Sequence, residues 1–304
     1  MISFFEKMMF NPSWYHYILI LLLSPLSMLY GFIMLFRRLF SRKTSFGITI
    51  VSIGNLIVGG SGKTPFVIAL ALRYEGVTVI SRGYGRKSSG LVEVSREGKI
   101  LCSVEQSGDE AMLMAQSLPT ASIIVSQSRE DAIVLAKKQG VKLILLDDGF
   151  NRVNIEKYEI LLDPQIIKNY LPFPAGAFRE FWFMKSYANV VAKEGRDFSR
   201  EVTFENLTPK MLLVTAISNP QRLDRYLPVE GIVNKIYLDD HAYFNKDELS
   251  KELKQSGATS ILCTSKDRVK LESFGFPISE MKLSLDINQD IFKNVDSYIS
   301  KVKI

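Results

Sequence analysis

The chain of 304 residues, with 47% hydrophobic and 23% charged residues, has the length and apolar content of one large or two small globular domains. Its two cysteines, Cys102 and Cys263, are too few for a disulfide framework and lie in no zinc-binding spacing. The net charge is +6, and it falls to +2 without the four positive charges between Arg37 and Lys43. A nucleic-acid binder usually carries basic residues over a whole face, so we expect no nucleic-acid partner.

The N-terminal segment is the first predicted element, a membrane helix. No Asp, Glu, Lys or Arg occurs from Met8 to Phe36, and about 20 apolar residues suffice to cross a bilayer. The basic cluster that follows, Arg37 to Lys43, favours anionic headgroups and the cytoplasmic side. A signal peptide would carry its positive charge before the apolar run. Pro25 removes a helix hydrogen bond, and both a spanning helix and a monotopic anchor stay open.

A glycine-rich loop comes next and predicts a phosphate site. It follows the β-branched run Ile48–Ile53 and opens a helix-compatible segment, and its residues are Gly59, Gly60, Ser61, Gly62, Lys63 and Thr64. In this context Lys63 would meet the β- and γ-phosphates of a nucleotide, and the Thr64 hydroxyl would hold Mg²⁺. The strict spacing requires a glycine where Ile57 stands. The alternative is a glycine turn that caps an ordinary helix.

Short apolar runs alternate with amphipathic stretches after Thr44, a pattern typical of βαβ units. We predict an α/β fold, similar to P-loop NTPases, with a mostly parallel sheet and helices on both faces. Past Thr215 the pattern restarts as a smaller second α/β lobe. The predicted domains are a membrane anchor at 1–44, a P-loop core at 45–215 and a C-terminal lobe at 216–304. The expected strands are Ile48–Ile53, Val77–Ser81, Ser122–Ser126, Leu143–Leu146, Glu159–Leu162, Ala188–Ala192, Met211–Thr215, Val233–Leu238 and Ser260–Thr264. In the second lobe, helices are expected at Pro220–Tyr226 and Lys246–Gln255.

Paired carboxylates end one of these strands. Asp147 and Asp148 follow the apolar run Leu143–Leu146 and precede Gly149, the form expected of a Walker B element that helps to hold Mg²⁺. Two adjacent acids at a buried strand end repel each other unless a cation or hydrogen-bond donors compensate. Asp-Asp-Gly is also a good turn sequence, which is the alternative.

Other polar residues are candidates for chemistry on a nucleotide and its acceptor. Asp109 and Glu110 precede a predicted helix, where Asp109 could be an N-cap or a base that takes a proton from a hydroxyl. His241 is the histidine that lies in a polar loop, as a proton relay or as an exposed side chain. Arg82 and Arg179 offer guanidinium forks suited to phosphate, although surface arginines are common.

Taken together, these motifs resemble the tetraacyldisaccharide 4'-kinase family of lipid A biosynthesis. The order and spacing of the motifs cover nearly the whole chain. The motifs are Gly54-Asn55, Gly59 to Pro65, Ser81 to Tyr84, Gly108 to Glu110, Leu146 to Phe150, Pro174 to Gly176, Arg179-Glu180, Asp240-His241 and Thr264 to Asp267.

The resemblance implies a kinase at the cytoplasmic face of the bacterial inner membrane. It would use ATP and Mg²⁺ to phosphorylate the 4'-hydroxyl of a lipid A disaccharide 1-phosphate, with the bilayer as its other partner. By resemblance, Asp109 is the base and is paired with His241. The other implied site residues are Lys63, Thr64 and the glycine loop for the triphosphate, Asp147 and Asp148 for the metal, and Glu110, Arg82, Arg179 and Glu180 near the active cleft.

The chain departs from the family pattern at two places. Asn151 and Arg152 stand where the family usually has Gln-His, and Ala216 to Pro220 replaces a glycine-containing pattern. The rival interpretation is a membrane-docked P-loop NTPase that acts as a switch or assembly factor. A GTPase of that kind should show Asn-Lys-x-Asp, and the stretches that begin at Asn234 and Asn245 both fail this test.

Overall fold

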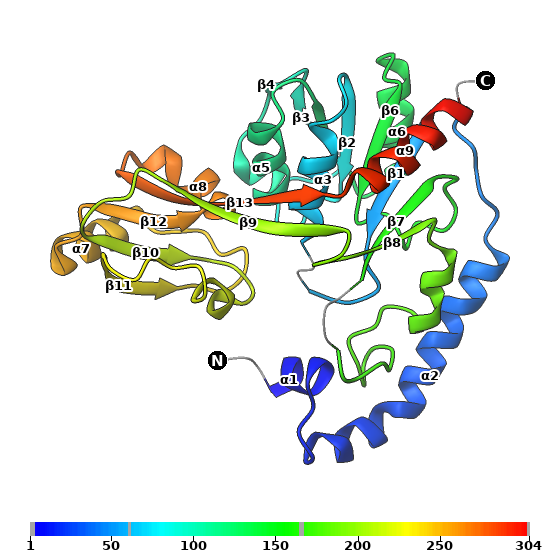
Figure 1. Ribbon diagram of the computed structural model, residues 1–304, viewed down its shortest axis with the longest axis horizontal. Helices are drawn as coiled ribbons and strands as arrows, with labels where there is room; N and C mark the ends of the chain where they lie inside the picture. Colours follow the sequence, from blue (N-terminus) through cyan, green and yellow to red (C-terminus); the bar gives the residue numbers. More distant parts are fainter. Residues whose placement is uncertain (1–3, 60–61, 164–166, 303–304) are drawn as a thin grey trace. The chain divides into compact units, whose positions relative to one another are not determined.

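The computed structural model describes residues 4–59, 62–163 and 167–302. Its strands form two sheets, in the hydrogen-bonded orders β4-β3-β5-β2-β6-β1-β7-β8 and β11-β10-β12-β13-β9 (Figure 1). The predicted α/β class with a mostly parallel larger sheet and a second, smaller lobe is confirmed. By its contacts the chain divides into two compact units, one built from Met1–Ile80, Arg129–Ser199 and Ile287–Ile304, the other from Ser81–Ser128 and Arg200–Asp286.

The first unit is built on parallel strands. The central pairs run in register from Thr49↔Leu143 and from Val51↔Tyr158, and the β1 and β6 residues are all buried. Continuous apolar runs of this kind are typical of strands covered on both faces. The elements of this unit are α1 (Phe4–Phe10), α2 (His16–Phe40), β1 (Thr49–Gly54), α3 (Lys63–Ala71), β2 (Val77–Ser81), α6 (Arg129–Lys138), β6 (Leu143–Asp147), β7 (Tyr158–Asp163), the 3₁₀ helix η1 (Trp182–Tyr187), β8 (Val190–Lys193) and α9 (Gln289–Val302).

The long apolar helix α2 continues through Pro25 and packs one narrow face against the segment 172–181 of the same unit (Figure 1). The Ser27 hydroxyl donates to the Pro172 carbonyl at 2.7 Å and accepts from the Ala175 amide at 2.8 Å. At Gly31 an added Cβ would lie 2.6 Å from the Phe181 ring, so this close approach requires glycine. The remaining surface of α2 is mostly exposed and apolar, and α2 is long and apolar enough to cross a membrane.

The second unit holds two sets of strands. β3 pairs antiparallel with β4 and β5, and β10 pairs parallel with β11 and β12. The elements are β3 (Val92–Arg96), β4 (Lys99–Ile100), α4 (Val104–Ser107), α5 (Asp109–Ser117), β5 (Ser122–Val125), β9 (Phe198–Glu205), β10 (Met211–Thr215), η2 (Pro220–Leu223), β11 (Ile232–Tyr237), α7 (Lys246–Ser256), β12 (Ser260–Thr264), α8 (Ser265–Leu271), η3 (Glu272–Phe274) and β13 (Ile278–Ile287).

One predicted helix is wrong in kind and in length. The segment Pro220–Tyr226 forms only the short 3₁₀ turn η2, at Pro220–Leu223, and none of the residues of this turn is buried. Helices draw most of their stability from packing an apolar face, so a segment without buried residues has little to extend it. The predicted domain boundaries at residues 44 and 215 stay predictions.

Candidate active site

The predicted phosphate loop lies between β1 and α3 in the first unit. Gly62 caps α3 with φ 79°, a left-handed conformation that favours glycine. Lys63 is the first residue of α3, and its side chain is 13% exposed. Thr64, the next residue, is buried. Gly60 and Ser61 lie outside the described residues, whereas Gly59 lies within them and is exposed, with φ 90°.

Ile57, which replaces the expected first glycine, is buried in an apolar cluster with Phe178. The Val58 amide donates to the Ala177 carbonyl at 2.9 Å, and the Arg179 amide donates to the Leu56 carbonyl at 2.7 Å. The beginning of the loop is therefore hydrogen-bonded to the segment that carries Arg179. Ile57 contributes packing at this position.

Asp148 connects the loop to that segment. Its carboxylate lies 3.6 Å from Lys63 Nζ and accepts two hydrogen bonds from Arg179 Nη1, at 3.0 and 2.9 Å. Burial alone would raise the pKa of Asp148, but the charges of Lys63 and Arg179 outweigh it and hold the pKa below its ordinary value. Asp148 adopts φ 52°, which is strained for a residue with a side chain. Lys63, Asp148 and Arg179 thus form one cluster at the end of β6.

Asp147 is the last residue of β6 and is buried. Its backbone carbonyl accepts a hydrogen bond from Arg129 Nη2 at 3.3 Å, and Arg129 itself is buried. The Arg129 charge also helps to lower the pKa of Asp148. Sequence reasoning missed Arg129. No motif points to it, and its place just after a strand, at the beginning of α6, was the one available signal.

The carboxylate of Glu180 is occupied by an arginine of α2. Arg38 Nε and Nη2 donate to its two oxygens at 2.8 and 2.9 Å. Although Glu180 follows Arg179 directly in the sequence, its carboxylate is bound to Arg38, whereas Arg179 is bound to Asp148.

The second unit holds a separate cluster of titratable side chains around Asp109. Nδ1 of His241 lies 3.0 Å from both carboxylate oxygens of Asp109. Lys266 Nζ lies 3.2 Å from Asp240, 3.6 Å from Glu110 and 3.9 Å from Asp109. The pairing of Asp109 with His241, expected from the family resemblance, is therefore present in the structure.

The charges around Asp109 set its protonation. Burial alone would raise the pKa of Asp109, but the hydrogen bond from His241 and the charges of Lys266, His241 and Lys270 outweigh it and lower the pKa. The Lys270 side chain is 2% exposed, and its ammonium lies 3.5 Å from Asp109. Sequence reasoning quoted Lys266 within a motif but assigned it no role, and it did not mention Lys270.

The positions of Asp109 and His241 are set by the beginning of α5 and by the loop conformation at residue 241. Asp109 is the first residue of α5 and Gly108 is the N-cap, so the alternative that Asp109 caps this helix is wrong. Its carboxylate also accepts the Glu110 amide hydrogen at 2.8 Å. His241 adopts φ 62°, and its ring packs on Tyr84 with 4.9 Å between the centroids. Arg82, also in this unit, is exposed.

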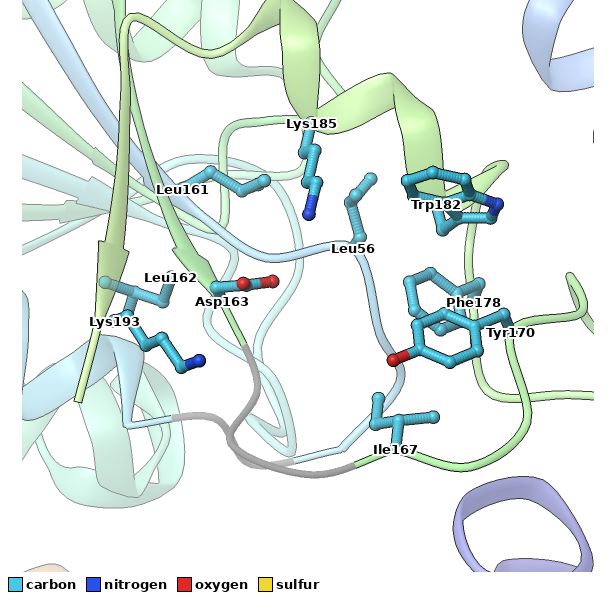
Figure 2. Close-up of a pocket in the computed structure, with 10 residues that line it drawn as sticks. All are labelled: Leu56, Leu161, Leu162, Asp163, Ile167, Tyr170, Phe178, Trp182, Lys185 and Lys193. Atoms are coloured by element: carbon cyan, nitrogen blue, oxygen red, sulfur yellow. The ribbon is translucent and has the colours of Figure 1, made fainter. Parts of the chain in front are cut away.

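A pocket of about 230 Å³ lies in the first unit, between β7, β8 and the segment that leads into η1 (Figure 2). Asp163 and Lys193, at the ends of β7 and β8, lie on one side of the pocket, and the rings of Tyr170 and Trp182 lie on the other. Lys185 adds a second ammonium group. Such a lining suits a ligand with both apolar and anionic parts.

The fold and the first-unit cluster define the class. β1, a glycine loop and a helix that begins with Lys-Thr are followed, at the end of the neighbouring sheet strand β6, by two carboxylates, and this arrangement makes the chain a P-loop α/β protein. The tetraacyldisaccharide-1-P 4'-kinase family profile matches residues 19–208 and 199–301. The chain belongs to this family.

Relatives match over nearly the full length. A tetraacyldisaccharide 4'-kinase of Helicobacter pylori is 46% identical over 300 residues, covering 97% of this chain and 95% of that protein. The enzyme of the same name from Campylobacter jejuni is 37% identical over 299 residues, with 97% and 96% covered. A crystal structure of LpxK from Aquifex aeolicus in complex with ATP has 26% identity and a TM-score of 0.73, covering 92% of this chain and 99% of that chain.

Proposed function

We propose that this chain transfers the γ-phosphate of ATP to the 4'-hydroxyl of a tetraacyldisaccharide 1-phosphate, which gives the bis-phosphorylated lipid A precursor lipid IVA. The main evidence is the family match over residues 19–301, with relatives of that name at 37–46% identity over 97% of this chain. The arrangement of both side-chain clusters supports this reaction, because phosphoryl transfer needs cations at the phosphates and a base at the acceptor.

We assign the triphosphate to the beginning of α3. Backbone N–H groups at a helix N-terminus and the Lys63 ammonium suit phosphate oxygens, and Arg179 adds a guanidinium 2.9 Å from Asp148. The related Aquifex structure is described as a complex with ATP. Gly59, Gly60 and Ser61 complete the proposed loop.

The residues present fit Mg²⁺. This ion keeps several waters and takes one or two carboxylates in addition to phosphate oxygens, and Asp147, Asp148 and the Thr64 hydroxyl offer that set. Among the residues that the structure describes, no group of three or more His, Cys, Asp or Glu side chains could form a metal cage, which agrees with such a sparse protein contribution. When bound, the ion would neutralise charge on the phosphates.

We assign the proton of the acceptor hydroxyl to Asp109 and His241. When Nδ1–H of His241 donates to Asp109, the imidazole fixes the orientation of the carboxylate and stabilises its negative charge. Glu110 and Arg82 are further candidates of the same unit for contact with substrate. Lys266 contacts Glu110 and Asp109 and keeps positive charge beside the pair.

We also propose that α2 holds the chain at the cytoplasmic face of the bacterial inner membrane. The acceptor is an amphiphile, and an enzyme at the same interface meets it at a raised effective concentration. The exposed apolar surface of α2 and the basic residues at its end support this location. Sedimentation of the full-length chain with anionic vesicles tests the attachment.

The direct test of function uses purified full-length protein in detergent micelles with radiolabelled ATP and disaccharide 1-phosphate lipid. We expect label in a bis-phosphorylated lipid, and no transfer to a lipid already phosphorylated at the 4'-position. Hydrolysis of ATP at the same rate with and without lipid, without labelled lipid product, would instead favour the alternative, a membrane-docked P-loop NTPase acting as a switch or assembly factor.

Replacing Lys266 with methionine should move the acid limb of the kcat/KM profile to higher pH. The lysine charge lowers the pKa of Asp109, so its removal raises that pKa, and Asp109 is protonated over more of the acid range. We expect roughly tenfold lower kcat/KM on the acid limb, with recovery at alkaline pH. Lys266→Arg retains the charge and should keep the wild-type limb. An equal loss at every pH would assign Lys266 another role.

A further inference from the structure

The C-terminal end of α2 is connected through Arg38 to the cluster of Lys63, Asp148 and Arg179, which we call the phosphate cluster. This side chain is 7% exposed and its partner Glu180 is 3% exposed. The guanidinium donates to both Glu180 oxygens, at 2.8 and 2.9 Å, and to the Phe150 carbonyl at 3.1 Å. It also lies over the Phe150 ring, 4.3 Å from the centroid. Such a forked, buried arginine pair fixes the geometry of both partners.

The two partners of Arg38 belong to the two segments that meet at the phosphate cluster. Phe150 lies two residues after Asp148, and Glu180 directly follows Arg179. Those segments contact each other where Arg179 Nη1 donates to the Asp148 carboxylate at 2.9 Å. Arg38 therefore links the same two segments a second time, next to the Asp148–Arg179 contact. Lys63, 3.6 Å from Asp148, completes the connection to the predicted nucleotide loop.

The neighbouring arginine has a different environment. The Arg37 side chain is 45% exposed, lies 4.0 Å from Glu180 and donates to the Asn151 carbonyl at 2.8 Å. It can interact with lipid headgroups, whereas Arg38 points into the protein. The two adjacent arginines at the end of α2 thus have different environments. A role at lipid headgroups, which the sequence pattern predicts, fits the exposed Arg37 but not the buried Arg38.

We propose that Arg38 is a positioning residue for phosphoryl transfer. Through its contacts with Phe150 and Glu180, it fixes the positions of the nearby Asp148 and Arg179 side chains. This rests on the proposed kinase function. The end of α2 then serves the chemistry as well as membrane attachment. Loss of the guanidinium removes both hydrogen bonds to the buried Glu180 carboxylate and leaves it only the Arg37 charge at 4.0 Å. The segment with Arg179 is therefore expected to shift, and turnover falls while vesicle binding persists.

The test compares Arg38→Gln, Arg38→Lys, Glu180→Gln and the double variant Arg38→Gln/Glu180→Gln in the full-length protein. The control is Arg73→Gln, an arginine of the same unit that pairs with Asp296 at 4.0 Å. For Arg38→Gln we expect kcat to fall at least about tenfold, with KM for ATP and vesicle sedimentation within twofold of wild type. Arg38→Lys should be intermediate because lysine keeps the charge but not the fork. The double variant should lose no more than the worse single variant.

Wild-type kcat in Arg38→Gln would overturn the inference, and so would a loss fully explained by a smaller folded fraction in thermal unfolding. A crystal structure of Arg38→Gln gives a second readout, in which we expect a displaced Asp148–Arg179 pair. An unaltered pair overturns the inference whatever the activity. If wild type transfers no phosphate to lipid, the proposed function fails by itself, and the position of this pair still decides the role of Arg38.

Discussion

Replacing Asp109 with asparagine is expected to lower kcat for phosphate transfer to the lipid by about 10³-fold, a loss within the range measured for general bases. Asparagine keeps the shape of the side chain and can still accept the Glu110 amide hydrogen. It cannot take a proton, and it loses the charge that Lys266 and Lys270 compensate. ATP affinity should stay within twofold, because the triphosphate is assigned to the beginning of α3 and Asp109 to the acceptor hydroxyl.

Steady-state kinetics with both substrates and calorimetric ATP binding separate these effects. Asp296→Asn is the matched control, since Asp296 also accepts a side-chain hydrogen bond, from Tyr74 at 2.9 Å, but is assigned no role in transfer. A parallel loss of ATP affinity and kcat in Asp109→Asn would indicate a structural role. An unchanged kcat would remove Asp109 from the mechanism.

The same substitution has a signed effect on stability. Because the folded-state pKa of Asp109 is depressed, its carboxylate stabilises the fold above the ordinary aspartate pKa, and this contribution is lost as the pH falls through the folded-state value. Asparagine lacks the contribution at every pH. The difference in free energy of unfolding between wild type and Asp109→Asn should therefore be largest near neutral pH and shrink in acid, as denaturant titrations at several pH values can measure.

Local patterns predict the strands of the first unit well, because buried parallel strands are continuous apolar runs. The run Leu143–Leu146 becomes β6 at Leu143–Asp147, and the run Ile48–Ile53 becomes β1, one residue further along. The helix expected at Lys246–Gln255 is α7, whose N-cap Asn245 accepts two backbone amide hydrogens. In each case the information lies within a few neighbouring residues.

Contacts between distant residues are what the sequence leaves undetermined. The family resemblance supplies Glu180 as a motif residue, yet its partner Arg38 lies 142 positions earlier and looks like one of several membrane-proximal charges. Lys266 likewise meets residues from two other segments of its unit, Asp109–Glu110 and Asp240. Such pairings follow from the tertiary fold, and no periodicity or spacing encodes them. The individual roles of the predicted site residues stay predictions.

Replacing Lys63 with alanine is expected to lower kcat by at least about 10²-fold, through loss of charge stabilisation at the transferring phosphoryl group. Lys63 is the first residue of α3, its ammonium lies 3.6 Å from Asp148, and its side chain is only 13% exposed, so little solvent screens the charge. Lys235→Ala is a suitable control, because Lys235 also pairs with an aspartate, Asp224 at 3.2 Å, outside either cluster. Turnover near wild type would remove the glycine loop from the mechanism.

The Lys63 variant should fold, which makes the kinetic loss interpretable. Asp148 keeps its two hydrogen bonds from Arg179, so the half-buried carboxylate keeps a cationic partner. Its pKa should nevertheless rise toward the ordinary value, since burial is then opposed by fewer charges. The stability that the depressed pKa gives wild type above the ordinary aspartate pKa is then reduced, so the difference in free energy of unfolding between wild type and variant should be largest near neutral pH and shrink in acid. Thermal unfolding across pH measures this shift. A large kcat loss in a variant that is still fully folded at the assay temperature and neutral pH would separate the charge that Lys63 supplies to the reaction from its part in holding Asp148.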